Sequence, residues 1–162
     1  MKEVYIVSVA RTPIGSFNGA LSSLSALELG KVAIQKAMER AGINGDQVDE
    51  VIMGNVLSAN LGQAPARQVS ILAGISNSAR ATTINKVCAS GMKAIALAAQ
   101  SIMLGDSDVV VAGGMESMSN SPFYLPSGRS GIRYGNGEII DAIVKDGLQD
   151  PYNKNMMGNT AE

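Results

Sequence analysis

The sequence contains no histidine and no tryptophan, a single cysteine, and only 4% aromatic residues. Without histidine, the chain has no imidazole to act as a general base, and the common Cys/His zinc patterns are excluded. A lone cysteine excludes an internal disulfide and fits a reducing compartment. We therefore expect no metal site and no tightly bound cofactor.

The sequence also has no excess of charge of either sign. Thirteen Lys and Arg face fourteen Asp and Glu, for a net charge of -1, and no basic stripe with interleaved aromatic residues is present. This excludes nucleic acid as an expected partner. The longest apolar run, Ala94 to Leu104, is too short for a membrane span and includes Gln100 and Ser101. The N-terminus lacks the features of a signal peptide, so we expect a cytoplasmic protein.

What is present is the composition of a globular domain, with 46% apolar and 17% charged residues. Apolar periodicity predicts strands that alternate with helices, in the order βαβαβαβ. This order predicts an α/β fold in three layers, with a parallel sheet covered by helices. The third helix is apolar on all sides and is expected to lie inside. The predicted strands cover residues 3–10, 48–57, 81–87 and 107–115, and the helices residues 25–42, 64–74 and 88–104.

The texture of the sequence changes at Ser117. The following residues, to Gly137, are rich in Ser, Asn, Pro and Gly and show little periodicity. We therefore place a domain boundary between residues 118 and 119. A helical pattern returns over residues 138–148, where Gly147 is expected to end it. The remaining residues show no closing element, so the second domain, residues 119–162, is expected to be truncated.

Cys88 can be interpreted in two ways. A lone cysteine is commonly a small buried hydrophobe. However, Cys88 stands where a predicted strand gives way to a helix, and the free N–H groups and positive dipole of a helix start stabilise a thiolate. Gly91, one turn later, would either let an acyl group approach the backbone or serve close packing. Composition alone does not choose between a nucleophile and a structural thiol.

Five segments together carry a family resemblance. They are NKVCASGMKAI around Cys88, SVARTPIGSF at residues 8–17, GQAPARQ at 62–68, VAGGMESMSN at 111–120 and KDGLQDPY at 145–152. In this order and spacing they resemble the N-terminal part of the thiolase family, in its biosynthetic acetyl-CoA acetyltransferase branch. The resemblance covers essentially every residue. It implies a thiolase-like three-layer fold, with the N-terminal half-domain followed by the start of the loop domain that covers coenzyme A.

The resemblance also implies an activity. Thiolases of this branch condense two acetyl-CoA molecules into acetoacetyl-CoA, or run the reverse thiolysis, through an acyl-enzyme on the cysteine matched by Cys88. The backbone N–H of Cys88 would serve as an oxyanion donor. Leu148 and Met157 fall on positions that line the acyl and pantetheine tunnel, although both could equally be core residues. The resemblance implies coenzyme A thioesters as substrates and a homo-oligomer, a dimer or tetramer, for the complete protein.

The sequence departs from the family in two respects. Met156 stands where these thiolases usually carry histidine, which alters the shape of the expected acyl pocket. The Gly-His-Pro histidine, the Asn-Glu-Ala-Phe segment and the Cys-x-Gly cysteine are all missing, so we expect the chain by itself to be inactive.

Three alternatives remain beside the acetyltransferase. One is a thiolase with a broader range of 3-ketoacyl-CoA substrates. A ketoacyl-ACP synthase is a second, although GGMESMSN and GQAPARQ argue against it. The third is a noncatalytic interaction subunit with an inert Cys88, which slow alkylation of the thiol would indicate.

Overall fold

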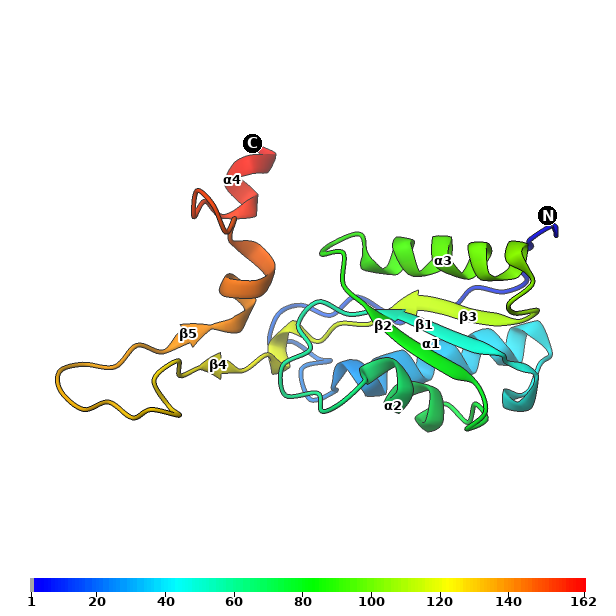
Figure 1. Ribbon diagram of the computed structural model, residues 1–162, viewed down its shortest axis with the longest axis horizontal. Helices are drawn as coiled ribbons and strands as arrows, with labels where there is room; N and C mark the ends of the chain where they lie inside the picture. The colour runs from blue at the N-terminus through cyan, green and yellow to red at the C-terminus, as the bar shows by residue number, and fades with distance from the viewer. Residues whose placement is uncertain (1) are drawn as a thin grey trace.

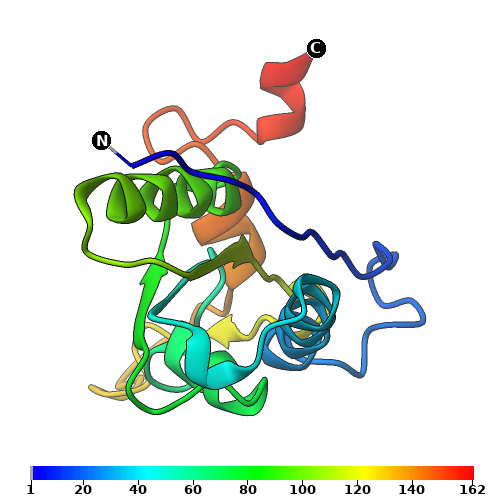
Figure 2. The same ribbon diagram turned by 90° about the vertical axis from the view of Figure 1, so that its right-hand side faces the viewer.

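The computed structural model describes residues 2–162 and shows an α/β core in three layers (Figure 1). Helices α1 (Ala26–Ala41) and α2 (Pro65–Leu72) cover one face of a parallel sheet, and α3 (Ser90–Leu104) covers the other (Figure 2). The sheet consists of β1 (Glu50–Gly54), β2 (Arg80–Ile84) and β3 (Val110–Gly114). The α/β fold class with a parallel sheet is therefore confirmed.

Strand β1 lies in the middle of the sheet, in the order β2-β1-β3. Its residues alternate between the two faces, so that Val51 and Met53 join the core beneath α1 and α2, while Ile52 joins Ala94 and Ala98 of α3. In register, Gly54 faces Ile84 of β2 and Gly114 of β3. Because all three strands are parallel, their carboxyl ends meet at one edge.

The local signals of the first helix are confirmed. Helix α1 begins after Ser25, whose hydroxyl accepts the N–H of Glu28 while the Glu28 carboxylate accepts the N–H of Ser25. It ends at Gly42, which has a left-handed conformation with φ 67°. Helix α2 begins at Pro65, in the first turn where the missing N–H of proline has no consequence. A short 3₁₀ turn, η1 (Gly45–Gln47), leads from α1 to β1.

The prediction of a buried strand over residues 3–10 is wrong. This segment forms no ladder with a neighbouring strand, and it runs along the β3 side of the core (Figures 1 and 2). Two side-chain contacts hold it, from Lys2 Nζ to Asp108 Oδ1 at 2.7 Å and from Arg40 Nη1 to the Val9 carbonyl oxygen at 2.6 Å. Tyr5 to Val7 remain more than 70% exposed. Its β-branched side chains favour an extended conformation, but a strand also needs a neighbouring strand as a hydrogen-bonding partner, and this segment has none.

The expectation that α3 lies inside is also wrong for this chain. Its inner face packs against β1 and β3, but Met92 and Leu104 on its outer face are 77% and 75% exposed. Among residues 2–162, the stretch Val87–Leu104 is long and apolar enough to cross a membrane by length and composition alone, although it includes Lys93. The core helix of a folded protein meets the same criterion. Apolar residues on all sides of α3 make both of its faces compatible with burial, but only the face against the sheet is buried.

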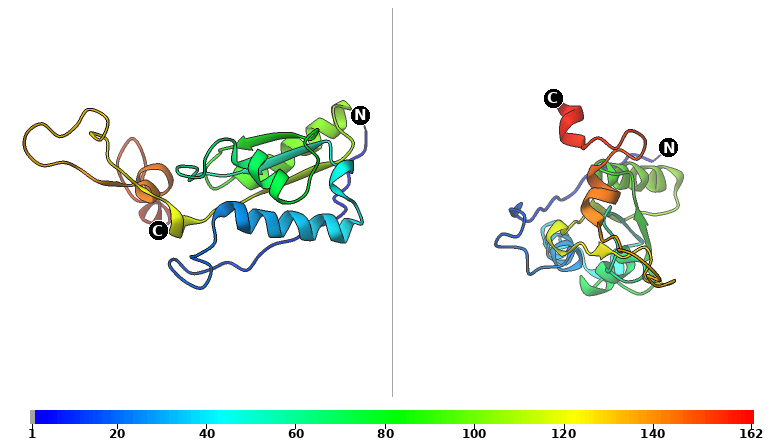
Figure 3. Two further views of the ribbon diagram at one scale, coloured as in Figure 1. Left: turned by 90° about the horizontal axis from the view of Figure 1, so that it is seen from below. Right: turned by 90° about the vertical axis from the view of Figure 1, so that its left-hand side faces the viewer.

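Beyond Met115, which still belongs to the core, the chain leaves the sheet. The turn η2 (Met118–Asn120) leads into β4 (Phe123–Tyr124), which pairs antiparallel with β5 (Ile140–Asp141), and the hairpin extends away from the sheet (Figure 3). The π-helix η3 (Ile143–Leu148) and helix α4 (Met157–Ala161) follow. Of the helix predicted over 138–148, residues 140–141 are strand β5 and residues 143–148 are the π-helix η3. Gly147 lies inside η3 instead of ending it, and α4 is an element that the sequence did not predict. The boundary at 118 and 119 stays a prediction.

Candidate functional site

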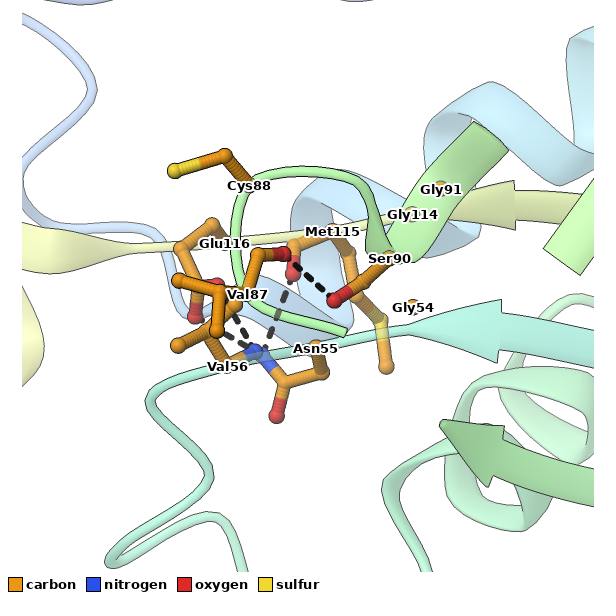
Figure 4. Close-up of a pocket in the computed structure, with 10 residues that line it drawn as sticks. All are labelled: Gly54, Asn55, Val56, Val87, Cys88, Ser90, Gly91, Gly114, Met115 and Glu116. Atoms are coloured by element: carbon orange, nitrogen blue, oxygen red, sulfur yellow. Dashed lines mark hydrogen bonds between the residues drawn. The ribbon is translucent and has the colours of Figure 1, made fainter. Parts of the chain in front are cut away.

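A cavity of about 280 Å³ opens at the edge where the parallel strands end (Figure 4). In parallel sheets, this edge is the usual position of a ligand site. The wall combines the carboxyl ends of β1 and β3 with the turn that enters α3. The lining residues are Gly54, Asn55, Val56, Val87, Cys88, Ser90, Gly91, Gly114, Met115 and Glu116.

Glycine allows the start of α3 to sit directly on the strand ends. A Cβ added at Gly54 would lie 2.5 Å from the carbonyl carbon of Ser90 and 2.7 Å from the nitrogen of Gly91, which is closer than real Cβ atoms approach. A Cβ added at Gly114 would lie 3.3 Å from Cα of Gly91. The backbone of the helix start is therefore in contact with the backbone of the sheet.

Cys88 lies in the turn between β2 and α3, two residues before the helix begins. Its side chain is exposed, and Figure 4 shows it on the outer side of the turn. The interpretation of Cys88 as a buried hydrophobe is therefore wrong. Among the residues that the structure describes, the backbone N–H groups of Cys88, Gly91 and Met92 have no hydrogen-bond partner. Free backbone donors beside a thiol can stabilise its thiolate, which is the nucleophilic form, and can also stabilise an oxyanion that develops on a substrate.

Ser90 fixes the shape of this turn. Its buried hydroxyl accepts the Lys86 N–H at 2.8 Å and donates to the Val87 carbonyl oxygen at 2.6 Å. The Asn85 side chain accepts the Val87 N–H at 2.9 Å. Sequence reasoning did not single out Ser90, although a hydroxyl residue at a predicted helix start was an available signal.

The floor of the cavity is held by Glu116 and Asn55. The Glu116 carboxylate accepts the N–H groups of Val56 and Leu57 at 2.9 and 3.1 Å, and an Asn55 side-chain N–H at 2.8 Å. Asn55 also donates to the Met115 carbonyl oxygen at 3.1 Å, and its backbone N–H bonds to Ile84. Burial raises the pKa of Glu116, although its three hydrogen bonds act in the opposite direction. These two residues tie all three strand ends together, and sequence reasoning missed both.

The three predicted pocket residues lie elsewhere. Leu148 is the last residue of η3, Met156 caps α4, and Met157 begins it. None of them lines the cavity around Cys88. Gly147 of η3 does lie near Leu57, since a Cβ added at Gly147 would be 3.5 Å from Cδ2 of Leu57, whose N–H Glu116 accepts. The role of these residues as tunnel walls stays a prediction.

The sequence model of the thiolase N-terminal domain family matches residues 4–162, which is nearly the whole chain. The chain belongs to the thiolase family. The match includes the turn with Cys88, both strand ends of the cavity floor, and the whole of the segment after β3. The family resemblance read from the five segments is therefore confirmed.

Several relatives of this thiolase chain are named acetyl-CoA acetyltransferase. The cytosolic acetyl-CoA acetyltransferase of Gibberella zeae is 61% identical over 159 residues, which are 98% of this chain and 40% of that protein. Acetyl-CoA acetyltransferase 2 of Arabidopsis thaliana is 60% identical over 161 residues, 99% of this chain and 40% of the relative. The mitochondrial acetyl-CoA acetyltransferase of Xenopus tropicalis is 61% identical over 162 residues, 100% of this chain and 38% of the relative.

A solved structure of the family shares the fold. The Acat5 thiolase of Ascaris suum, crystallised in complex with coenzyme A, superposes with a TM-score of 0.94 at 49% identity. The match covers 99% of this chain and 41% of that one. The chain thus spans about 40% of the length of the thiolases that it matches, and it corresponds to their N-terminal part.

Proposed function

We propose that this chain forms the N-terminal part of an acetyl-CoA C-acetyltransferase and supplies Cys88 as the acyl acceptor. The observation that carries the proposal is the exposed Cys88 thiol at the wall of a cavity, beside backbone N–H groups that have no partner among the described residues. The relatives named acetyl-CoA acetyltransferase support the choice of the acetyl group.

The first half of the reaction uses groups that this chain contains. The Cys88 thiolate attacks the carbonyl carbon of acetyl-CoA, so that an S–C bond forms, and the C–S bond to coenzyme A breaks as coenzyme A leaves as a thiolate. Negative charge develops on the carbonyl oxygen during this step. The N–H of Cys88 is available to donate to that oxygen, which is the role that an oxyanion hole requires.

The second half requires a base. A proton must leave the methyl carbon of a second acetyl-CoA, the resulting carbanion forms a C–C bond with the acetyl group on Cys88, and the thiolate is released. The chain contains no histidine. General acid and base catalysis typically contributes about 10²- to 10⁴-fold to a rate. We therefore propose that acetoacetyl-CoA is formed or cleaved at a useful rate only when the remaining part of a thiolase completes the site.

Substrate and assembly follow from the same proposal. Coenzyme A thioesters are the substrates, as the coenzyme A complex of the Ascaris suum thiolase supports. Leu148, Met156 and Met157 would approach the pantetheine arm from the segment after β3, as the resemblance to the thiolase family implies. The complete protein is proposed to form a homo-oligomer. We propose a cytosolic location, as in the Gibberella zeae relative, whereas the Xenopus tropicalis relative is named mitochondrial.

The proposal is tested by coenzyme A-dependent cleavage of acetoacetyl-CoA. We expect no turnover by the purified 162-residue chain, and turnover when the C-terminal part of the Gibberella zeae relative is added. Cys88→Ala, mixed with the same C-terminal part, should remain inactive. Turnover by the chain alone at the rate of a complete thiolase would contradict the proposed division of the site. Equal activity of the Cys88→Ala mixture would refute the role of Cys88 and favour a noncatalytic subunit.

A further inference from the structure

Val87, immediately before Cys88, has a backbone conformation that valine rarely adopts. Its φ is 49°, in the left-handed region. Asn18 and Asn60 share this region, and asparagine tolerates it, whereas a β-branched side chain is strained there. Among the residues that the structure describes, Val87 is the only β-branched one with a positive φ. Strained residues of this kind cluster at functional sites and persist only where their surroundings enforce them.

The surroundings of Val87 do enforce its conformation. Its N–H is held by the Asn85 side chain, and its carbonyl oxygen accepts both the backbone N–H and the hydroxyl of Ser90 at 3.0 and 2.6 Å. The Ser90 hydroxyl is also bonded to the Lys86 N–H, so that one buried side chain bridges the residues on both sides of the turn. Figure 4 shows this hydroxyl pointing at the Val87 carbonyl.

Folding alone gives no reason for valine at this position. The Val87 side chain is 50% exposed, so its burial contributes only part of what a core valine contributes. Glycine would adopt the same φ without strain. The strain is therefore only partly offset by packing. Because Val87 directly precedes Cys88, its backbone conformation sets the direction in which the chain enters Cys88.

We propose that Val87 and Ser90 are positioning residues that hold the sulfur and the N–H of Cys88 toward one point of the cavity. The inference rests on the proposed role of Cys88 as acyl acceptor. Acylation needs the thiolate and an oxyanion donor to meet one carbonyl group at once, and a misplacement of about 1 Å can cost about 100-fold in rate. Alkylation needs only an accessible thiolate. Loss of the strained turn should therefore slow acylation of Cys88 more than its alkylation.

Two substitutions at one position separate the backbone from the side chain. Val87→Gly removes both the side chain and the strain. Val87→Ala removes most of the side chain, but alanine is still strained at a positive φ. Ser90→Ala removes the hydroxyl that bridges the turn. If Ser90→Ala does not fold, the two Val87 variants still carry the test. Each variant is made in the 162-residue chain, and Cys88→Ala gives the background reaction of the other side chains.

Three rates or transitions are measured for each variant: thermal unfolding, alkylation by iodoacetamide, and acetylation by p-nitrophenyl acetate. In acetylation the Cys88 sulfur bonds to the acetyl carbon and p-nitrophenolate leaves. We expect Val87→Gly to unfold at a higher temperature than Val87→Ala, because its strain is relieved. Its ratio of acetylation to alkylation should fall about tenfold or more, whereas Val87→Ala should stay within about twofold of the unaltered chain. Ser90→Ala should lose acetylation selectively, as Val87→Gly does.

The outcomes distinguish this inference from the proposed function. If the unaltered chain is acetylated at Cys88 but Val87→Gly and Val87→Ala share one ratio, the positioning role is refuted and the acyl-acceptor role stands. If Val87→Gly unfolds no later than Val87→Ala, the turn is not strained and the inference is overturned. If Cys88 of the unaltered chain is alkylated but never acetylated, the proposed function fails on this chain and the positioning role falls with it.

Discussion

Gly54 determines how closely α3 approaches the sheet, and through that contact it determines where Cys88 lies. The Cβ of any other residue at this position would overlap the backbone of Ser90 and Gly91. The backbone of a helix start cannot yield as the end of a flexible side chain can. Gly113, in β3, offers a comparison, because a Cβ there would meet only Sδ of Met53 at 3.9 Å.

Gly54→Ala should therefore destabilise the chain by about 1–3 kcal/mol, or displace the turn that carries Cys88. Gly113→Ala should change the free energy of unfolding by less than about 0.5 kcal/mol, as expected of a site without overlap. Urea unfolding of both variants measures the difference. An equal effect of the two substitutions would mean that the start of α3 does not rest on Gly54.

Strands β1 and β3 are joined at their amino ends by the carboxylate of Asp49. It accepts the N–H groups of Asp108 and Val109 at 2.8 and 2.9 Å. These bonds lower the pKa of Asp49 below its usual 3.8, and the bond from Val109 has the largest effect. A carboxyl whose pKa is lower in the folded than in the unfolded chain contributes stability above its unfolded pKa, and this stability is lost as the pH falls through its folded pKa.

Asp49→Asn should therefore reduce the free energy of unfolding at neutral pH and make it less dependent on pH in the acid range. Asp46→Asn is the control, since the Asp46 carboxylate accepts no hydrogen bond among the described residues. Unfolding by urea at a series of pH values from about 7 to about 3 measures both. If Asp49→Asn keeps the full acid dependence of the unaltered chain, the Asp49 bonds contribute nothing to it.

The elements that the sequence predicted correctly are those whose signals are local. The capping residues Ser25 and Gly42 bound α1, and Pro65 begins α2. Runs of apolar or β-branched residues form the three parallel strands. The role of Cys88 as nucleophile came from the family resemblance and stays a prediction, whereas its position just before a helix is confirmed. What failed depended on neighbours: residues 3–10 have strand propensity but no ladder, and an apolar α3 has only one covered face. The roles of Asn55, Ser90 and Glu116 arise from contacts between distant loops, which no local pattern records.

Viewed as a whole, the chain leaves much apolar surface uncovered. The outer face of α3 exposes Met92 and Ile95, and residues of the N-terminal segment such as Tyr5 and Val7 are equally uncovered. Exposed apolar side chains that lie together on one face favour association in water. The chain spans about 40% of the length of its relatives, and this accounts for part of the exposed apolar surface.

The isolated chain should therefore self-associate as its concentration rises. Replacing Met92 and Ile95 together by lysine should shift it toward the monomer, because the two residues are neighbours on one face of α3. Val32→Lys is the control on α1, where a single exposed apolar residue is replaced. Sedimentation velocity over a range of concentrations measures the distribution. A chain that stays monomeric without any substitution would contradict this expectation.

Cys88 is the residue proposed to receive the acetyl group. The direct measurement is to incubate the purified chain with radiolabelled acetyl-CoA, digest it, and locate the label by mass spectrometry of the peptides. We predict label on the peptide that contains Cys88, released by hydroxylamine as expected of a thioester, and none on that peptide in Cys88→Ala. Label on Cys88→Ala at the level of the unaltered chain, or none on Cys88 while the thiol still reacts with iodoacetamide, would contradict the account.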